Sequence, residues 1–247
     1  MHALLATVMW LLTSPALGFE AALPPQSTQL VIAVGASMDA SQVQVQRYER
    51  AEVSAPWSAV GAPIAARIGK NGMAWGRGLH GATPTGQRSK REGDWRAPMG
   101  TFRIGSAFGD APAAPENTKW PYRTVTQNDL WVEDAKAKTY NQHIIVPSDR
   151  PRTDWEESQR MKMGDAAHRL KIAVEHNYGQ QVQAGAGSAI FFHIWRQSGA
   201  RPTSGCTAMA EANLKDLLKW LSPEGAPVYV LLDQERYRNA KAEGSLP

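Results

Sequence analysis

The sequence is poor in cysteine, in long apolar runs and in repeats. Cys206 is the only cysteine among 247 residues, so the chain cannot form an intrachain disulfide, which excludes the disulfide-stabilised secreted folds. No apolar stretch after the first 18 residues is long enough to cross a membrane. A chain of this length without repeats or a long linker suits one large domain or two small ones.

Two further absences narrow the function. The six histidines occur without a His-Glu-x-x-His motif or paired cysteines, so we predict no metal and no other cofactor. The net charge is +4 at pH 7, yet no nucleic-acid-binding motif accompanies this charge, and we predict no nucleic-acid partner.

The first 18 residues contain no Lys, Arg, Asp or Glu, and residues 3–12 are almost wholly apolar. Ala16 and Gly18 supply the small residues expected at the −3 and −1 positions of a cleavage site. We therefore predict a signal peptide over residues 1–18, export to the periplasm or cell envelope, and membrane association only through this segment. An uncleaved anchor is the alternative, because His2 and the terminal amine are the only positive groups of the n-region.

Continuous or alternating apolar patterns predict β-strands along most of the chain. The predicted strands are Leu30–Val34, Val43–Tyr48, Pro63–Ile68, Gly72–Trp75, Ile144–Val146, Lys171–Glu175, Ala189–Phe192 and Pro227–Asp233. The fold class is therefore mainly β with flanking helices (α+β), in a single β-rich domain.

Three segments are predicted to be helical or irregular. Leucines at 214, 217, 218 and 221 form the stripe of an amphipathic helix that begins near Glu211, where Ala210 is a poor N-cap. The long charged segment 150–168 is predicted to be a loop with a helical turn, and such loops often act as lids. Residues 234–247 are predicted to be a polar C-terminal tail that frays.

Cys206 and His193 are the candidate catalytic residues. The histidine ends a predicted buried strand, and a loop rich in turn-forming residues leads from it to the cysteine. We expect the thiol where this loop turns directly towards the predicted helix. A thiol becomes a useful nucleophile when an imidazole stabilises or generates the thiolate, and backbone N–H groups near Gly205 and Cys206 are placed to meet a substrate carbonyl. The alternative is structural, with both side chains simply filling the core.

The same stretch resembles the L,D-transpeptidase catalytic-domain family of the YkuD type. The matching pattern is His193, a loop, and Thr203-Ser204-Gly205-Cys206. Similar short motifs occur at Lys90–Asp94, Ala97–Phe102, Tyr140–Gln142, Glu175–Asn177 and Ser188–Phe191, and they favour a subgroup of bacterial envelope proteins. Two positions depart from typical members, which carry histidine before the Gly-Cys pair and arginine two residues after the cysteine. This chain has Ser204 and Ala208.

The resemblance implies an L,D-transpeptidase-like catalytic domain over residues 19–233. Its activity would be L,D-transpeptidation of peptidoglycan stem peptides, with a D-amino acid or peptide amine as acceptor. Cys206 would form a thioester and His193 would act as base. The predicted oxyanion and substrate-binding residues are Gly205, Ser204, Thr203 and Arg196.

Two alternatives stay open at this point. One is a hydrolase of the same fold, an L,D-carboxypeptidase or amidase, and the other is a non-catalytic wall-binding module. The basic segment 87–96 is predicted to be a solvated loop, with a cationic rim for anionic wall polymer as the functional alternative.

Overall fold

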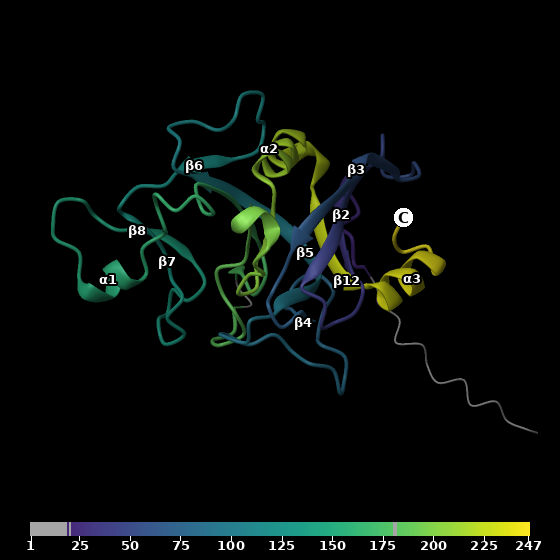
Figure 1. The fold of residues 1–247 in the computed structure, drawn as a ribbon, viewed down its shortest axis with the longest axis horizontal. Coiled ribbons are helices and arrows are strands. Elements are labelled where there is room, and N and C mark those ends of the chain that lie inside the picture. The colour runs from purple at the N-terminus through teal and green to yellow at the C-terminus, as the bar shows by residue number, and fades with distance from the viewer. Residues whose placement is uncertain (1–18, 20, 180–181) are drawn as a thin grey trace, which may run out of the picture.

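In the computed structural model, which describes residues 19, 21–179 and 182–247, eight strands form a closed ring. Figure 1 shows α1 (Asp154–Ser158), β7 (Asp129–Trp131) and β8 (His143–Ile145) at one end of the molecule and α3 (Gln234–Ala242) at the other. The predicted signal peptide lies outside the described residues. Around the ring the order is β12-β1-β2-β3-β11-β10-β9-β5, and β5 then pairs with β12. These strands are β1 (Gln29–Gly35), β2 (Gln42–Glu49), β3 (Ser58–Arg67), β5 (Ala97–Gly109), β9 (Leu170–Val174), β10 (Phe191–Ile194), β11 (Thr207–Met209) and β12 (Val228–Asp233).

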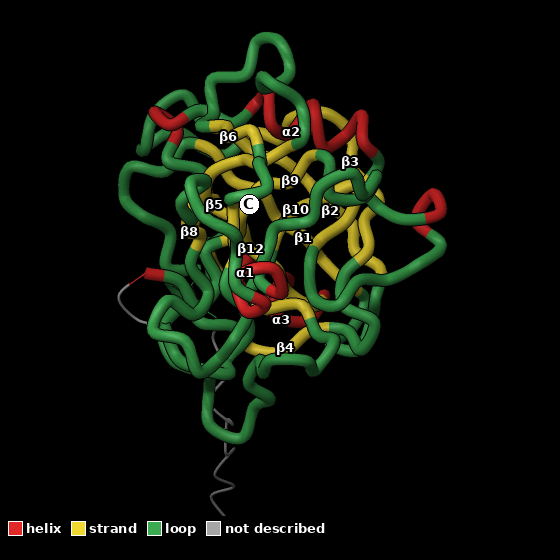
Figure 2. The backbone as a smooth tube through the Cα atoms, turned by 90° about the vertical axis from the view of Figure 1, so that its left-hand side faces the viewer, coloured by secondary structure: helices red, strands yellow, loops and turns green. Residues whose placement is uncertain are grey.

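The shorter elements are attached to this ring. The strands β4 (Met73–Trp75) and β6 (Tyr122–Thr124) each pair with β5, while β7 (Asp129–Trp131) and β8 (His143–Ile145) form a separate two-stranded sheet. The helix α1 (Asp154–Ser158) begins with a capping box between Thr153 and Glu156. Figure 2 shows the strands at the centre of the molecule with loops and helices around them. No helix of the described residues is long and apolar enough to span a membrane.

The predicted strands and the mainly β fold class are confirmed. The central strands β1 and β12 are apolar and buried along nearly their whole length, whereas Val43 and Val45 of β2 alternate with exposed glutamines. The helix α2 (Glu211–Trp220) begins at the predicted residue and buries Leu214, Leu217 and Leu218. Its N-cap Ala210 makes no side-chain cap hydrogen bond, as the sequence indicates.

Two local predictions are wrong. Cys206 leads first into the short strand β11, not directly towards α2, because the backbone after the cysteine pairs with β10 and β3. The C-terminal segment does not fray: it forms α3 (Gln234–Ala242), capped by the Asp233 side chain. Ala240 and Leu246 are buried against the core, so two small apolar contacts hold a mostly polar segment in place.

Candidate active site

Three neighbouring strands align the candidate residues on one face of the sheet. In the strand register Lys171 of β9 lies opposite His193 of β10, and His193 lies opposite Ala208 of β11. Residues that are directly opposite on paired strands project from the same face, and so do residues two positions apart on one strand. Phe191 therefore belongs to the same face, and Cys206, one residue before β11, lines the same pocket.

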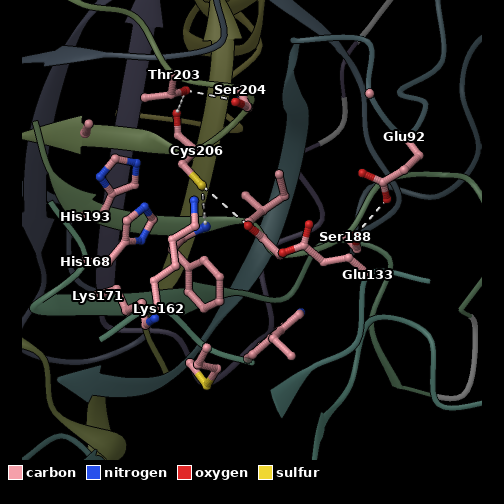
Figure 3. A pocket seen from close by; sticks show the side chains of 18 of the residues that line it. Glu92, Glu133, Lys162, His168, Lys171, Ser188, His193, Thr203, Ser204 and Cys206 are labelled. Atoms are coloured by element: carbon pink, nitrogen blue, oxygen red, sulfur yellow. Dashed lines mark hydrogen bonds between the residues drawn. The ribbon is translucent and has the colours of Figure 1, made fainter. Parts of the chain in front are cut away.

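This face forms one wall of a pocket with a volume of about 710 Å³. We call Lys171, Phe191, His193 and Cys206 the strand wall. Figure 3 shows His193, His168, Lys171 and Lys162 on one side of Cys206, and Ser188, Glu133 and Glu92 on the other. Two further segments complete the lining, namely residues 158–162 of the predicted lid and residues 201–205 of the loop before the cysteine.

His193 has the tautomer that a general base needs. Its ring is 6% exposed, and its Nδ1 atom lies 2.8 Å from the backbone carbonyl oxygen of Ile194. A carbonyl only accepts, so Nδ1 carries the proton and Nε2 is left with a lone pair. Burial lowers the pKa of His193 to about 4, although this hydrogen bond opposes the shift. The imidazole is therefore neutral near pH 7.

His168 stacks against His193, with ring centroids 4.8 Å apart and the planes tilted by 27°. Burial, with the neighbouring His193 and lysine charges, lowers the pKa of His168 to about 3. In the sequence His168 is one of several scattered histidines, and nothing local indicates this contact. This contact fixes one face of the ring of His193, the candidate catalytic histidine.

The Cys206 thiol lies in the same pocket but rests against backbone groups. Its Sγ atom accepts the Phe191 N–H at 3.4 Å and lies 3.5 Å from the Ala189 carbonyl oxygen. Burial raises the pKa of Cys206 to about 11. No hydrogen bond between Cys206 and His193 is present in the described part of the chain. In the ground state a neutral thiol therefore lies beside a neutral imidazole. The thiol must rotate before it can contact the imidazole.

Thr203 shapes the loop that carries the cysteine. Its hydroxyl donates to the Cys206 carbonyl oxygen at 2.6 Å and accepts the Gly205 N–H at 3.1 Å. Gly205 has a φ of +154°, and a Cβ atom there would lie 2.9 Å from the Arg96 carbonyl oxygen, so the position requires glycine. The Gly205 N–H expected at the oxyanion is thus occupied in this structure. Ser204 is exposed and lines the pocket.

Arg196 lies at the rim of the pocket, where its guanidinium pairs with the Asp165 carboxylate. The guanidinium side chain is 47% exposed. It can turn towards a ligand, but in this structure its charge is already matched.

The opposite side of the pocket is built from loops: Glu92 and Ser188 line it, and Tyr140 and Asn141 support these loops through hydrogen bonds. We call these four residues the loop wall. One Glu92 carboxylate oxygen accepts the Tyr140 hydroxyl at 2.5 Å and the Ser188 hydroxyl at 2.7 Å. The His176 carbonyl joins this network as an acceptor for Asn141. Four of the motifs that carry the family resemblance, those of Glu92, Asn141, His176 and Ser188, therefore meet here. These motifs hold the pocket in shape.

Asn141 is the central residue of the loop wall and is 2% exposed. Its Nδ2 group donates to the carbonyls of His176 and Asn177 at 2.9 and 2.7 Å. Its Oδ1 atom accepts the Ala189 N–H at 3.0 Å and the Trp131 indole N–H at 2.9 Å. Every polar atom of the amide group is thus used.

The basic segment 87–96 is a loop in which most residues are exposed, as predicted. Lys90 is the buried exception: it is 6% exposed, and its ammonium lies 2.5 Å from an Asp94 carboxylate oxygen. Arg88 and Arg96 both pair with Asp39. The alternative of a free cationic rim therefore needs correction, because two carboxylates pair with three of the four cations of the segment.

Comparison with known proteins gives the family. Residues 63–230 match the model of the L,D-transpeptidase catalytic domain, YkuD. The chain belongs to this family. No curated protein matches it. It is also similar to a solved structure, the helical cell shape determining protein Pgp2 from Campylobacter jejuni, with 14% identity and a TM-score of 0.39. That match covers 83% of this chain and 48% of the other, so the chain spans about half the length of that protein.

The L,D-transpeptidase domain brings together all the site residues that the sequence indicates, and it adds three. Cys206, His193, Gly205, Ser204, Thr203 and Arg196 all line the one pocket. Lys171, Glu133 and His168 also line it, although no motif in the sequence indicates them. A signal for Lys171 exists: a lysine inside an otherwise apolar strand is rare in a buried sheet unless it is used.

Proposed function

We propose that this L,D-transpeptidase-family protein is an exported cysteine acyltransferase that acts on peptidoglycan stem peptides in the cell envelope. The observation that carries the proposal is the common pocket of Cys206 and His193, in a chain that belongs to this family. The tautomer of His193 supports it further, since the lone pair on Nε2 is available to accept a proton.

In the proposed reaction, substrate binding turns the Cys206 thiol away from the Ala189 carbonyl and towards His193. The imidazole takes the thiol proton while sulfur attacks the carbonyl that precedes the terminal D-residue. The proton then passes to the leaving amine, the terminal residue departs, and a thioester remains. An acceptor amine attacks the thioester, His193 removes its proton, and the thiol is regenerated.

The developing oxyanion needs hydrogen-bond donors near the thiol. The Cys206 N–H makes no hydrogen bond in the described part of the chain and is the first donor. The Gly205 N–H becomes a second one if the Thr203 hydroxyl releases it, with the Ser204 hydroxyl as an exposed contributor.

We further propose transfer over hydrolysis as the fate of the thioester. Residues 158–162 of the predicted lid line the pocket, which supports a closure that excludes water. The hydrolase alternative, an L,D-carboxypeptidase, uses the same thiol and differs only in the attacking group. The wall-binding alternative needs no thiol at all.

One experiment tests the three functions together. Purified protein is incubated with tetrapeptide muropeptide and D-Met, and the products are identified by mass. Exchanged tetrapeptide as the main product, lost in Cys206→Ala, is the expected result. Tripeptide as the main product at saturating D-Met would show hydrolysis. Equal turnover by Cys206→Ala would overturn the mechanism, and binding without turnover would leave the wall-binding function.

A further inference from the structure

Lys171 is a buried cation whose ammonium forms no salt bridge or hydrogen bond in the described part of the chain. The residue is 3% exposed, yet it lines the pocket that also contains Cys206. Its Nζ atom lies over the Phe191 ring, 5.6 Å from the ring centroid. The carboxylates of Asp110 and Asp165 raise its pKa through space, but neither is paired with it.

Such a group is costly to bury, and proteins usually pair it. Burial lowers the pKa of Lys171 to about 8, so it is still mostly protonated at neutral pH. The acidic groups that line the pocket, Glu92 and Glu133, lie on its other side (Figure 3). Lys162, on the same side as Lys171, adds a second positive charge. Because neither Asp110 nor Asp165 forms a salt bridge with Lys171, the ammonium can pair with an anion that enters the pocket.

The position of Lys171 limits what that anion can be. Lys171 is the cross-strand neighbour of His193, and cross-strand neighbours have Cβ atoms about 5 Å apart. Cys206 lies two residues before Ala208, the other cross-strand neighbour of His193, and lines the same pocket. An anion bound by the ammonium would thus sit within a few bonds of the atom that sulfur attacks.

We propose that Lys171 binds the carboxylate of the terminal residue that leaves the donor peptide. This assignment rests on the proposed function, in which the scissile amide joins a terminal residue with a free carboxylate. That carboxylate is separated from the scissile nitrogen only by the α-carbon, which suits a cation adjacent to the thiol and the base. Lys171 then selects peptide ends over internal peptide bonds, where the carboxylate is replaced by an amide.

The test uses two alkylating reagents of nearly equal shape, iodoacetate and iodoacetamide, and follows the mass of Cys206 at pH 7.5. Only iodoacetate carries a carboxylate. The ratio of the two rates, iodoacetate over iodoacetamide, is expected to fall about tenfold or more in Lys171→Met, as is typical for loss of a charge-assisted contact. Lys171→Arg should keep most of the ratio. Lys219→Met, which removes the same charge from an exposed position of α2, is the matched control and should leave the ratio unchanged.

Other outcomes would overturn the proposal. If Lys171→Met slows both reagents equally, the lysine tunes the thiol and does not bind carboxylate. If the ratio falls equally in Lys219→Met, the effect is general charge and not a site. Alkylation of Cys206 requires no turnover. A wild-type protein that shows the expected ratio of alkylation rates but does not turn over muropeptides would therefore contradict the proposed function and not the carboxylate-binding role of Lys171.

A substrate measurement completes the test. For a tetrapeptide and its C-terminal amide, wild-type kcat/KM should favour the free acid by at least tenfold, and Lys171→Met should lose this preference mainly through KM. An unchanged preference in the variant would refute the role of Lys171.

Discussion

The two walls of the pocket differ in whether their polar groups have hydrogen-bonding or ionic partners. In the loop wall every polar atom of the Asn141 amide has a partner, and Glu92 accepts two hydroxyls. In the strand wall the Lys171 ammonium forms no ion pair with any described residue, and the Nε2 atom of His193 accepts no hydrogen bond from one. Buried polar groups in proteins are normally satisfied. The loop wall follows that rule, whereas the strand wall leaves these two groups unpaired, which is consistent with its proposed role in binding substrate.

The largest effect is expected from His193. Replacing it with glutamine keeps a polar side chain but removes the base, so turnover of muropeptides should fall about 10²–10⁴-fold. The unfolding midpoint should change little, because the strand wall contributes chemistry more than stability. The measurements are steady-state turnover and urea denaturation of the same sample. A variant that keeps a tenth or more of wild-type activity would remove His193 from the mechanism.

The pH dependence of Cys206 alkylation distinguishes two states of the strand wall, a neutral thiol and a preformed thiolate. Because burial raises the pKa of Cys206 to about 11, iodoacetamide should react about tenfold faster for each pH unit between 7 and 10. The reaction rate of the ligand-free protein is followed by intact mass over this range. A flat profile above pH 6 would instead reveal a preformed thiolate–imidazolium pair, in conflict with the neutral pair described above.

Asn141 tests the loop wall. Asn141→Ala leaves two buried carbonyls and two N–H groups without partners, and it should lower the free energy of unfolding by about 2–4 kcal/mol. Asn141 has a φ of +56°, which alanine tolerates less well. Asn117→Ala is the matched control, since Asn117 has a φ of +65° but is exposed. Equal losses in both variants would attribute the effect to backbone conformation and not to the hydrogen bonds.

The smallest expected effect is a gain in stability, from a substitution of Lys171. Lys171→Met should raise the free energy of unfolding by about 1–3 kcal/mol at pH 7, because an unpaired buried ammonium is removed. The pKa of Lys171 is about 8 in the folded protein against 10.5 for an ordinary lysine, so between these values the unfolded state binds more protons. The wild type therefore gains stability as pH rises through this window, and the difference from the variant should shrink. Denaturation at pH 7 and pH 9.5 measures it, and destabilisation by the substitution would contradict this view of the strand wall.

Much of the fold follows from local sequence patterns. The apolar run of β1 and the alternation of β2 act over a few residues, and so does the leucine stripe of α2. The same holds for the candidate nucleophile and base, whose pattern lies within one short stretch. The segment after Asp233 shows where such reasoning fails: its composition is polar, but Ala240 and Leu246 are buried by contacts with distant strands.

The sequence by itself determined the strand-rich fold, the thiol and the histidine, because side-chain periodicity and turn chemistry are local properties. Only the tertiary structure decided that β9, β10 and β11 lie side by side in their observed register. That register places Lys171 beside His193. The tertiary structure also stacks the His168 ring on the His193 ring. Strand order and register depend on closing long loops and burying whole faces at once. No short stretch of sequence carries that information, so the neighbours of His193 appear only in the folded chain.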